Sequence, residues 1–296
     1  MSSRHQKRGR AETTLDVINT TLLVLFALLC FYPIWFFLIN SISAPAQIAR
    51  GIYLLPRAVT AYNYQKLFSE VDNLAPAFVV SVARTLIGTV LTLACSSFVA
   101  FLCTQKDMPC RRAVYRFFVV TMYINAGTIP WFLTMKMFGL YNNFLLYVLP
   151  TAVTAFFVIL LKTYFESIPA EIQESAEIDG AGTLTIYAMI LLPLCKPVLA
   201  SVAVFSSVNQ WNAWYDNFML VSKSNLQTVQ YLLYLYLTKN TAITGNTAAS
   251  AAATMKTSPQ SIRITITMVT MIPIIIVYPA MQRYFVKGIM LGAIKG

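Results

Sequence analysis

The 296-residue sequence is poor in charge, since Asp, Glu, Lys and Arg together make up only 11% of it. An ordinary soluble domain carries about 25%. Hydrophobic residues make up 57%, and the mean hydropathy is +0.64. So few charged residues could not cover a soluble core of this composition. The composition therefore excludes an ordinary soluble domain and indicates an integral membrane protein.

Histidine and paired cysteine are scarce as well. The one histidine, His5, lies in a polar N-terminal stretch, and the five cysteines show no metal-binding spacing. The sequence therefore predicts neither a metal site nor a histidine-based catalytic centre. The net charge of +11 could suit nucleic acid. However, the basic residues flank apolar stretches, where membrane topology requires them, so we expect no nucleic-acid partner.

Six apolar segments are long enough to cross a bilayer as helices, which takes roughly 20 residues. They cover residues 17–40, 75–103, 114–137, 144–164, 197–221 and 262–285. The fold class is thus an all-α integral membrane protein with six transmembrane helices. We expect one transmembrane domain over residues 14–296, with no internal repeat.

A polar, basic stretch over residues 1–13 precedes the first segment. We expect a cytoplasmic tail rather than a cleaved signal peptide, because the apolar run that follows is too long and no small-residue cleavage site ends it. With six spans, thirteen Lys and Arg residues fall on the side of this tail and seven on the other. The positive-inside rule then places both termini in the cytoplasm.

Two outer loops are long, residues 41–74 and 222–261. The first contains a segment that predicts a short interfacial helix, with Tyr62, Tyr64 and Phe68 as anchors. The second contains "TAITGNTAASAAATMKTSPQ", which is small and polar and is expected to be flexible because it can bury little surface.

Nearly half of the acids lie in one loop, residues 165–196, between the fourth and fifth spans. Of the eleven in the chain, five fall between positions 166 and 179: Glu166, Glu171, Glu174, Glu177 and Asp179. Pro169 favours a helix start and Gly180 a helix stop. A second helical segment follows, and Pro193 and Pro197 separate it from the fifth span. The loop is either a solvated surface hairpin or a docking surface.

The spacing in this loop resembles a known signature. Glu-x-Ala, three residues, Gly, nine residues and Ile-x-Leu-Pro correspond here to Glu174, Ala176, Gly180, Ile190, Leu192 and Pro193. The pattern is similar to the coupling loop of permease subunits in binding-protein-dependent ABC importers. Ser175 stands where that family usually has Ala, and a small residue should fit the same packing.

Other segments carry the resemblance over nearly the whole chain from about residue 15. "MYINAGTIPWFLTMKMFGLYNNF", "NQWNAWYDNFMLV" and "YPAMQRYFVKGIMLGAIKG" resemble the carbohydrate branch of these permeases, the maltose-type superfamily. Within this branch they are most similar to importers of oligosaccharides or polysaccharide fragments. The stretch around residues 240–256 departs from the family in being longer and richer in alanine.

The resemblance implies a subunit of the bacterial plasma membrane that imports a sugar by ATP-driven alternating access and catalyses no covalent change. Its partners would be a second permease, two ATPase subunits and an extracellular solute-binding protein. ATP and Mg would bind to the ATPases, because this chain has no phosphate-binding GxxxxGK[ST] loop. The implied coupling residues are Glu171, Glu174, Ser175, Ala176, Glu177, Asp179, Gly180 and Pro193.

Polar residues within spans are costly and often functional, so they are candidates for the solute pathway. The candidates are Arg84, Asn125, Trp131, Gln210, Trp211, Asn212, Trp214, Tyr215 and Asp216. Arg84 either faces a water-filled path and an acidic solute, or forms a structural pair with Asp216 or backbone carbonyls. The aromatic residues are either sugar platforms or an interfacial belt. The break at "NAGTIPW" either lines a cavity or is a packing kink.

Two other functional classes fit the sequence less well. A secondary transporter or channel should show ion-coupling acids within its spans or inverted repeats, and the sequence has neither. A membrane enzyme should show clustered catalytic carboxylates or histidines, and the acidic loop has helical spacing and no histidine. The sequence does not identify the sugar, although Arg84 and the basic balance favour an acidic one.

Overall fold

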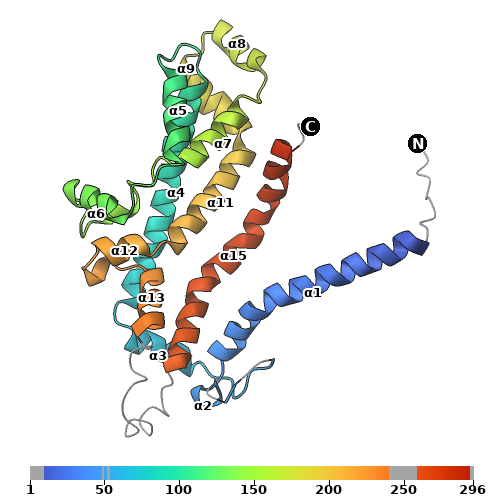
Figure 1. Ribbon diagram of the computed structural model, residues 1–296, viewed down its shortest axis with the longest axis vertical. Coiled ribbons are helices and arrows are strands. Elements are labelled where there is room, and N and C mark those ends of the chain that lie inside the picture. The colour runs from blue at the N-terminus through green and yellow to red at the C-terminus, as the bar shows by residue number, and fades with distance from the viewer. Residues whose placement is uncertain (1–9, 49, 52–53, 240–258, 294–296) are drawn as a thin grey trace. The chain divides into compact units, whose positions relative to one another are not determined.

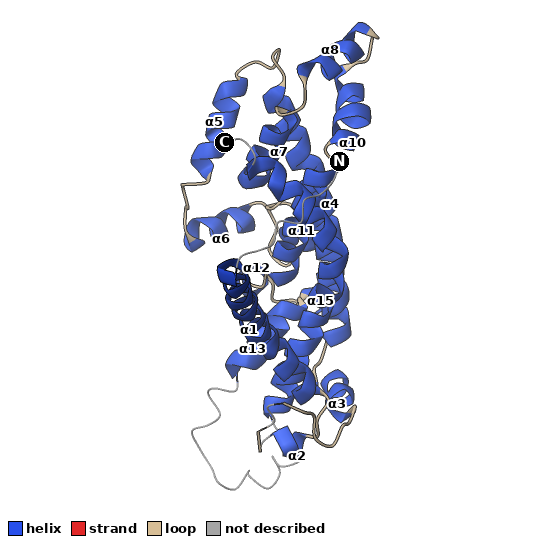
Figure 2. Cartoon of the chain, turned by 90° about the vertical axis from the view of Figure 1, so that its right-hand side faces the viewer, coloured by secondary structure: helices blue, strands red, loops and turns tan. Residues whose placement is uncertain are grey.

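The computed structural model describes residues 10–48, 50–51, 54–239 and 259–293. All the regular elements of this part of the chain are helices (Figures 1 and 2). The one β-type pairing found there is an isolated bridge between Ser43 and Val59. The predicted all-α class is confirmed. The chain divides into two compact units, and α15 contributes to both, changing from one to the other after Val269.

The first unit contains the N-terminal helices and the start of α15. Its helices are α1 (Arg10–Ser41), α2 (Pro45–Ile48), α3 (Tyr62–Glu70) and the first part of α15 (Pro259–Ala293). The short helix predicted near Tyr62 is therefore present. Tyr62 and Phe68 are exposed on it, whereas the hydroxyl of Tyr64 is hydrogen-bonded to Ser41, 2.9 Å away. Tyr64 therefore ties α3 to the end of α1.

The second unit carries all of the candidate coupling and pathway residues. Its helices are α4 (Leu74–Thr104), α5 (Arg111–Thr121), α6 (Thr128–Met137), η1 (Phe144–Tyr147), α7 (Ala155–Phe165), α8 (Ala170–Ile178), α9 (Thr183–Thr185), the π-helix η2 (Ile186–Leu191), α10 (Leu192–Leu194), α11 (Lys196–Asn212), α12 (Tyr215–Leu220), η3 (Ser224–Leu226) and α13 (Val229–Lys239). The remainder of α15 completes it.

Three of the described helices are long and apolar enough to cross a membrane: α1, α4 and α15. The segment Thr183–Leu194 together with α11 makes a fourth if this pair, bent by 81°, counts as one span. The other expected spans are interrupted, because α5 and α6 are separated by residues 122–127 and only α7 is α-helical in the fourth. The number of six spans therefore stays a prediction.

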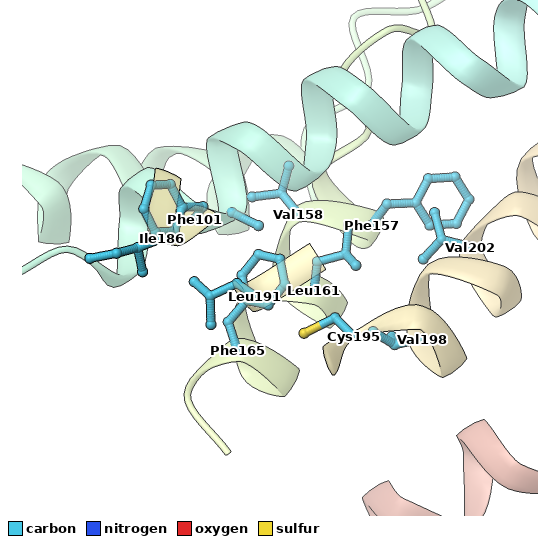
Figure 3. Close-up of a cluster of buried hydrophobic side chains, with 11 residues drawn as sticks. Phe101, Phe157, Val158, Leu161, Phe165, Ile186, Leu191, Cys195, Val198 and Val202 are labelled. Carbon is cyan, nitrogen blue, oxygen red and sulfur yellow. The ribbon is translucent and has the colours of Figure 1, made fainter. Parts of the chain in front are cut away.

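The core of the second unit lies where α4 packs against α7 and α11. Buried side chains from these helices and from η2 form one apolar cluster (Figure 3): Ala100, Phe101, Phe157, Val158, Leu161, Phe165, Ile186, Leu191, Cys195, Val198 and Val202. Burial of a side chain of this kind contributes roughly 1.5–3 kcal/mol. The cluster therefore joins α4, α7 and α11 into the packed core of this unit.

The polar face of α4 supports the irregular segment before α7. Thr92 donates to the carbonyl of Thr151 at 3.0 Å, and Ser96 accepts from the backbone N–H of Thr154 at 3.3 Å. Non-helical backbone at membrane depth needs such partners because lipid offers none. The small hydroxyl side chains of α4 therefore allow the chain to leave helical geometry between η1 and α7.

The helix α13 lies within the stretch that the sequence assigns to an outer loop. Its first residue, Val229, donates its backbone N–H to the hydroxyl of Ser81 on α4 at 2.9 Å. The alanine-rich stretch around residues 240–256, for which we expected flexibility, lies outside the described residues. The stretch that the sequence assigns to an outer loop thus contains a helix that is anchored to α4.

Candidate functional site

The acidic loop folds as predicted, into a short helix that ends at a glycine. The helix α8 begins after Pro169, and Gly180 adopts a φ of +82° just beyond its end. The N–H of Gly180 bonds to the carbonyl of Glu177, and the N–H of Ala181 bonds to that of Ala176. This pair of bonds is a Schellman motif, which satisfies the last carbonyls of a helix and favours glycine at the turn.

One side of α8 is anchored to the core, and the other is open. Ala176 and Ala181 are half-buried and pack against the cluster of α4, α7 and α11, so the small side chain of Ala176 serves this chain's own packing. The four acids of the helix and its end, Glu171, Glu174, Glu177 and Asp179, are exposed and form no ion pair with any described residue. Within the described part of the chain, the helix therefore presents negative charge without an ion-pair partner.

Two of these carboxylates face a groove. Glu174 and Glu177 line a groove of about 500 Å³ together with Gln173, Glu166, Lys106 of the turn after α4, and Arg111 at the start of α5. Ser175 turns back and donates to the carbonyl of Glu171 at 2.7 Å. Of the signature residues, Glu174 thus lines the groove, Ser175 bonds to the helix backbone and Ala176 packs against the core.

A sharp bend follows this helix. The segment that carries Pro193 meets α11 at 81°, with the break at Cys195. The predicted separation from the fifth span is confirmed, and proline accounts for it because it cannot continue a helix without losing a hydrogen bond. In Figures 1 and 2, α8 lies at one end of α4, α7 and α11, and α12 lies toward the other end.

Three pathway candidates meet at the break between α5 and α6. Asn125, Trp131 and Tyr215 line one cavity of about 530 Å³. Tyr215 donates its hydroxyl to Thr128 at 3.0 Å, and its ring lies 6.4 Å from the ring of Trp131. Aromatic faces beside amide and hydroxyl groups suit the alternating apolar and polar faces of a sugar ring. The break at "NAGTIPW" therefore lines a cavity.

The other aromatic candidates are occupied within the chain. Trp211 is buried and donates its indole N–H to the carbonyl of Thr270 at 3.0 Å. Trp214 stacks on Tyr234 of α13, with ring centroids 4.2 Å apart. Asn212 is exposed and accepts a hydrogen bond from Gln230. These side chains hold α11, α13 and α15 together. They are not among the residues that line the cavity, although the ring of Trp214 lies 5.8 Å from the ring of Tyr215.

Arg84 has its partners inside the chain. It is 2% exposed and forms an ion pair with Asp216, as one of the two sequence-based readings expects. Its Nε donates to Gln210 at 3.0 Å, and one terminal nitrogen donates to the carbonyl of Ala213 at 3.1 Å. The guanidinium also lies 4.6 Å from the ring centre of Tyr147. Arg84, Gln210 and Asp216 thus form one buried network.

Some residues of these sites give no distinctive sequence signal. Ile178 is 86% exposed beside the acids of α8, and Leu184 is also exposed just after the Schellman turn. In an apolar chain two more aliphatic residues attract no attention, although isoleucine so exposed on a charged helix is unusual. Thr128 is likewise ordinary in sequence, and only the fold places it against Tyr215.

Comparisons with known proteins place this geometry in a family. No family model matches the chain. It is 31% identical over 282 residues to the polygalacturonan/rhamnogalacturonan transport system permease protein YtcP of Bacillus subtilis (strain 168), covering 95% of this chain and 98% of the relative. It is 24% identical over 302 residues to the diacetylchitobiose uptake system permease protein NgcG of Streptomyces coelicolor, covering 98% and 93%.

A solved structure has the same fold. One chain of a bacterial ABC transporter involved in the import of the acidic polysaccharide alginate superposes with a TM-score of 0.84. The two sequences are 29% identical, and the match covers 95% of this chain and 99% of that one. The agreement in fold and in sequence extends over nearly the full length.

Proposed function

The chain belongs to the family of transmembrane permease subunits of carbohydrate ABC importers, and we propose that it carries an oligosaccharide or polysaccharide fragment across the membrane by ATP-driven alternating access. It is a multi-pass membrane protein and a transport subunit rather than an enzyme. One relative is described as a polygalacturonan/rhamnogalacturonan permease, and the structural neighbour serves alginate import. Both descriptions favour an acidic solute.

The observation that carries the proposal is the state of α8. Four carboxylates on and just after this helix are exposed and lack ion-pair partners among the described residues, while Ala176 holds the helix to the core. An anchored helix of this kind suits a partner protein that brings positive charge. We assign that partner as an ATPase subunit, with Glu174 pairing to one of its basic residues. Ile178 would supply an apolar contact beside the acids.

The proposed assembly contains a second permease, two ATPase subunits and an extracellular solute-binding protein. ATP and Mg bind to the ATPases, and this chain holds neither. We propose six spans, with both termini and α8 in the cytoplasm. In this arrangement the α5–α6 pair and the stretch from η1 to α7 are crossings interrupted by irregular backbone, which is tolerated where it is buried or lines a cavity.

The proposed solute pathway includes the cavity at the α5–α6 break. Asn125 and Thr128 offer hydrogen bonds, while Trp131 and Tyr215 offer aromatic contact. Each residue known to line the cavity in the described part of the chain is uncharged. The cavity therefore suits sugar hydroxyls and ring faces, and it leaves any carboxylate of the solute to be recognised elsewhere in the assembly.

The first test is co-purification. The tagged chain is expressed with its genomic neighbours, and the wild type is compared with Glu174→Lys and with Glu70→Lys, which makes the same charge change at an exposed acid of α3. We expect an ATPase to co-purify with the wild type and with the Glu70 variant. The Glu174 variant should lose the ATPase or lose the link between ATP turnover and uptake of labelled trigalacturonate.

Two outcomes would contradict the proposal. If a folded wild-type complex binds no ATPase, the importer assignment of this chain loses its main support and an autonomous secondary transporter becomes the better hypothesis. If the Glu70 and Glu174 variants behave alike, α8 is an ordinary solvated helix and energy enters the permease elsewhere.

A further inference from the structure

The buried network around Arg84 lies next to the proposed solute cavity. Three residues accept hydrogen bonds from the Arg84 side chain: Gln210, Ala213 and Asp216. They are spaced three residues apart and lie on both sides of the break between α11 and α12. Gln210 belongs to α11, Ala213 is the residue at which that helix ends, and Asp216 belongs to α12. One side chain of α4 thus binds both sides of the break.

The donors of Arg84 are used almost completely inside the chain. Four hydrogen bonds run from its guanidinium to Gln210, Ala213 and both carboxylate oxygens of Asp216. Two-point contact with a carboxylate fixes orientation as well as distance. The aromatic ring of Tyr147 lies against the guanidinium. A solute carboxylate could reach this charge only by displacing Asp216.

The network also satisfies the backbone where the helix stops. A helix leaves its last carbonyls without partners, and at membrane depth water does not supply them. The carbonyl of Ala213 is bonded to Arg84 instead. Asp216 in turn accepts the backbone N–H of Asn217 at 2.8 Å. The break is therefore held in one geometry by groups of α4 and of α12 itself.

The direction of Tyr215 follows from this geometry. Neighbouring residues of a helix point about 100° apart. Because Asp216 points to Arg84, Tyr215 is turned to Thr128 and Trp131 on the cavity wall. Any rotation of α12 that loosened the ion pair would also move the ring of Tyr215.

Gln210 packs closely against Gly88 of α4. A Cβ atom at position 88 of α4 would lie 2.4 Å from the side-chain nitrogen of Gln210, so a larger residue there would force the Gln210 amide to shift. That nitrogen donates to the hydroxyl of Thr151 at 2.7 Å, while the amide oxygen accepts from Arg84. Gln210 thus links Arg84 to the irregular segment before α7.

From these contacts we propose that Arg84 is a positioning residue of the solute pathway. Together with Gln210 and Asp216 it holds α12 so that Tyr215 forms the wall of the α5–α6 cavity, and it does not bind the solute. The inference rests on the proposed function for the role of the cavity. The positioning of α12 itself does not depend on any solute.

The first experiment measures α12 directly, without solute. Spin labels are placed at Leu133 on α6 and Phe218 on α12, both exposed, after the exposed Cys30 and Cys110 are replaced by serine. The distance distribution is measured by pulsed electron resonance in the purified complex. We expect Arg84→Lys and Asp216→Asn to shift and broaden it. The control Thr89→Val, on the same helix, should leave it unchanged because the Thr89 hydroxyl has no hydrogen-bond partner among the described residues.

The variant Arg84→Lys tests whether Arg84 positions α12 or only compensates the charge of Asp216. Lysine keeps the positive charge and a bond to Asp216, but it cannot bind Gln210, Ala213 and both carboxylate oxygens at once. If Arg84 only neutralises Asp216, the lysine variant keeps the wild-type distance distribution, and the proposal is overturned. If Arg84 positions α12, the distance distribution of the lysine variant differs from that of the wild type while the complex remains assembled.

The second experiment measures uptake of trigalacturonate and of its fully methyl-esterified, neutral form. Loss of positioning should lower the transport of both by a similar factor, about tenfold for a change of 1.4 kcal/mol. Direct binding of a carboxylate by Arg84 would instead lower the uptake of the acid alone in Arg84→Lys. It would also raise acid uptake in Asp216→Asn, which frees the guanidinium. Either of these selective results overturns the proposal.

The two experiments can contradict different parts of the proposal. A changed distance distribution, with uptake of both solutes unaffected, keeps the role of Arg84 in holding α12 and overturns the assignment of the cavity to the solute pathway. An unchanged distribution in both assembled variants overturns the positioning role, whatever the transported solute.

Discussion

The acids of α8 and the ion pair at the α11–α12 break represent two opposite uses of charge in one helical unit. On α8, Glu174 is exposed and forms no ion pair with any described residue. At the break, Asp216 is mostly buried and bonded to Arg84, which is bonded in turn to Gln210 and Ala213. Both sites belong to the same bundle, yet only the first leaves its charge available to another molecule.

The difference gives a criterion for assigning roles to charged residues in a membrane protein. A buried charge whose hydrogen bonds are completed inside the chain stabilises the structure of that chain. An exposed charge on an anchored helix is available to bind a partner. Arg84 alone in the sequence could belong to either group, and only its contacts decide between them.

The largest expected effect comes from removing the acid of the buried pair. Asp216→Leu leaves the guanidinium of Arg84 buried with neutral partners alone, which are Gln210, the Ala213 carbonyl and the ring of Tyr147. Breaking a buried ion pair in this way costs about 3–5 kcal/mol, because the remaining charge has lost its compensation. The free energy of unfolding of the detergent-solubilised complex is the measurement.

Glu174→Leu is the matched control for that change. It removes an exposed carboxylate that has no ion-pair partner among the described residues, and surface substitutions of this kind stay within about 0.5 kcal/mol. Equal destabilisation by the two variants would contradict the distinction between the charges of α8 and those of the break.

The next effect concerns the space around Gln210. Gly88→Ala forces the Gln210 amide to move, although this amide is held by Arg84 and Thr151. Overpacking of this kind typically costs 1–3 kcal/mol. In the double variant with Gln210→Ala, which removes the obstructing amide, the penalty for Gly88→Ala should vanish. Additive losses in this double-mutant cycle would show that Gln210 is not the contact that requires glycine.

The sequence predicts the elements of α8 well because their causes are local. Pro169 and Gly180 mark its ends through their own backbone preferences, and the structure confirms both. Long apolar runs are local signals too, so the prediction of 75–103 nearly coincides with α4. The helix α13 was missed, because its contact with Ser81 joins residues far apart in the chain.

The pathway residues show where sequence reasoning ends. Trp211, Trp214 and Tyr215 look equivalent in "NQWNAWYDNF", but each has a different environment. Helical rotation and the break after Asn212 send one to α15, one to α13 and one to the cavity. Composition cannot resolve such a division, because it depends on which element packs against each face.

A smaller effect tests the turn that ends α8. Gly180 has a φ of +82°, and nothing lies within 4 Å of an added Cβ, so Gly180→Ala introduces backbone strain without a clash. The strain is about 1 kcal/mol. Gly182→Ala is the matched control, since its φ of −69° suits any residue and its surroundings are equally open. Hydrogen exchange of the α8 amides should accelerate about fivefold in the first variant. Equal exchange in both variants would exclude strain at position 180.

The smallest effect returns to ion pairs, this time at the end of the bundle where α8 lies. Lys162 and Glu166 are paired at 2.7 Å, but the Glu166 side chain is 50% exposed. An exposed pair one helical turn apart contributes about 0.3–0.5 kcal/mol, and salt screens it. Glu166→Gln should therefore lower the free energy of unfolding only slightly at low salt and not at all at high salt. Lys162 also lies 4.3 Å from the ring centre of Tyr115, a contact that survives this change. A salt-independent loss of unfolding free energy as large as that of Asp216→Leu would contradict the comparison. It would mean that burial does not account for the difference between the Arg84–Asp216 and Lys162–Glu166 pairs.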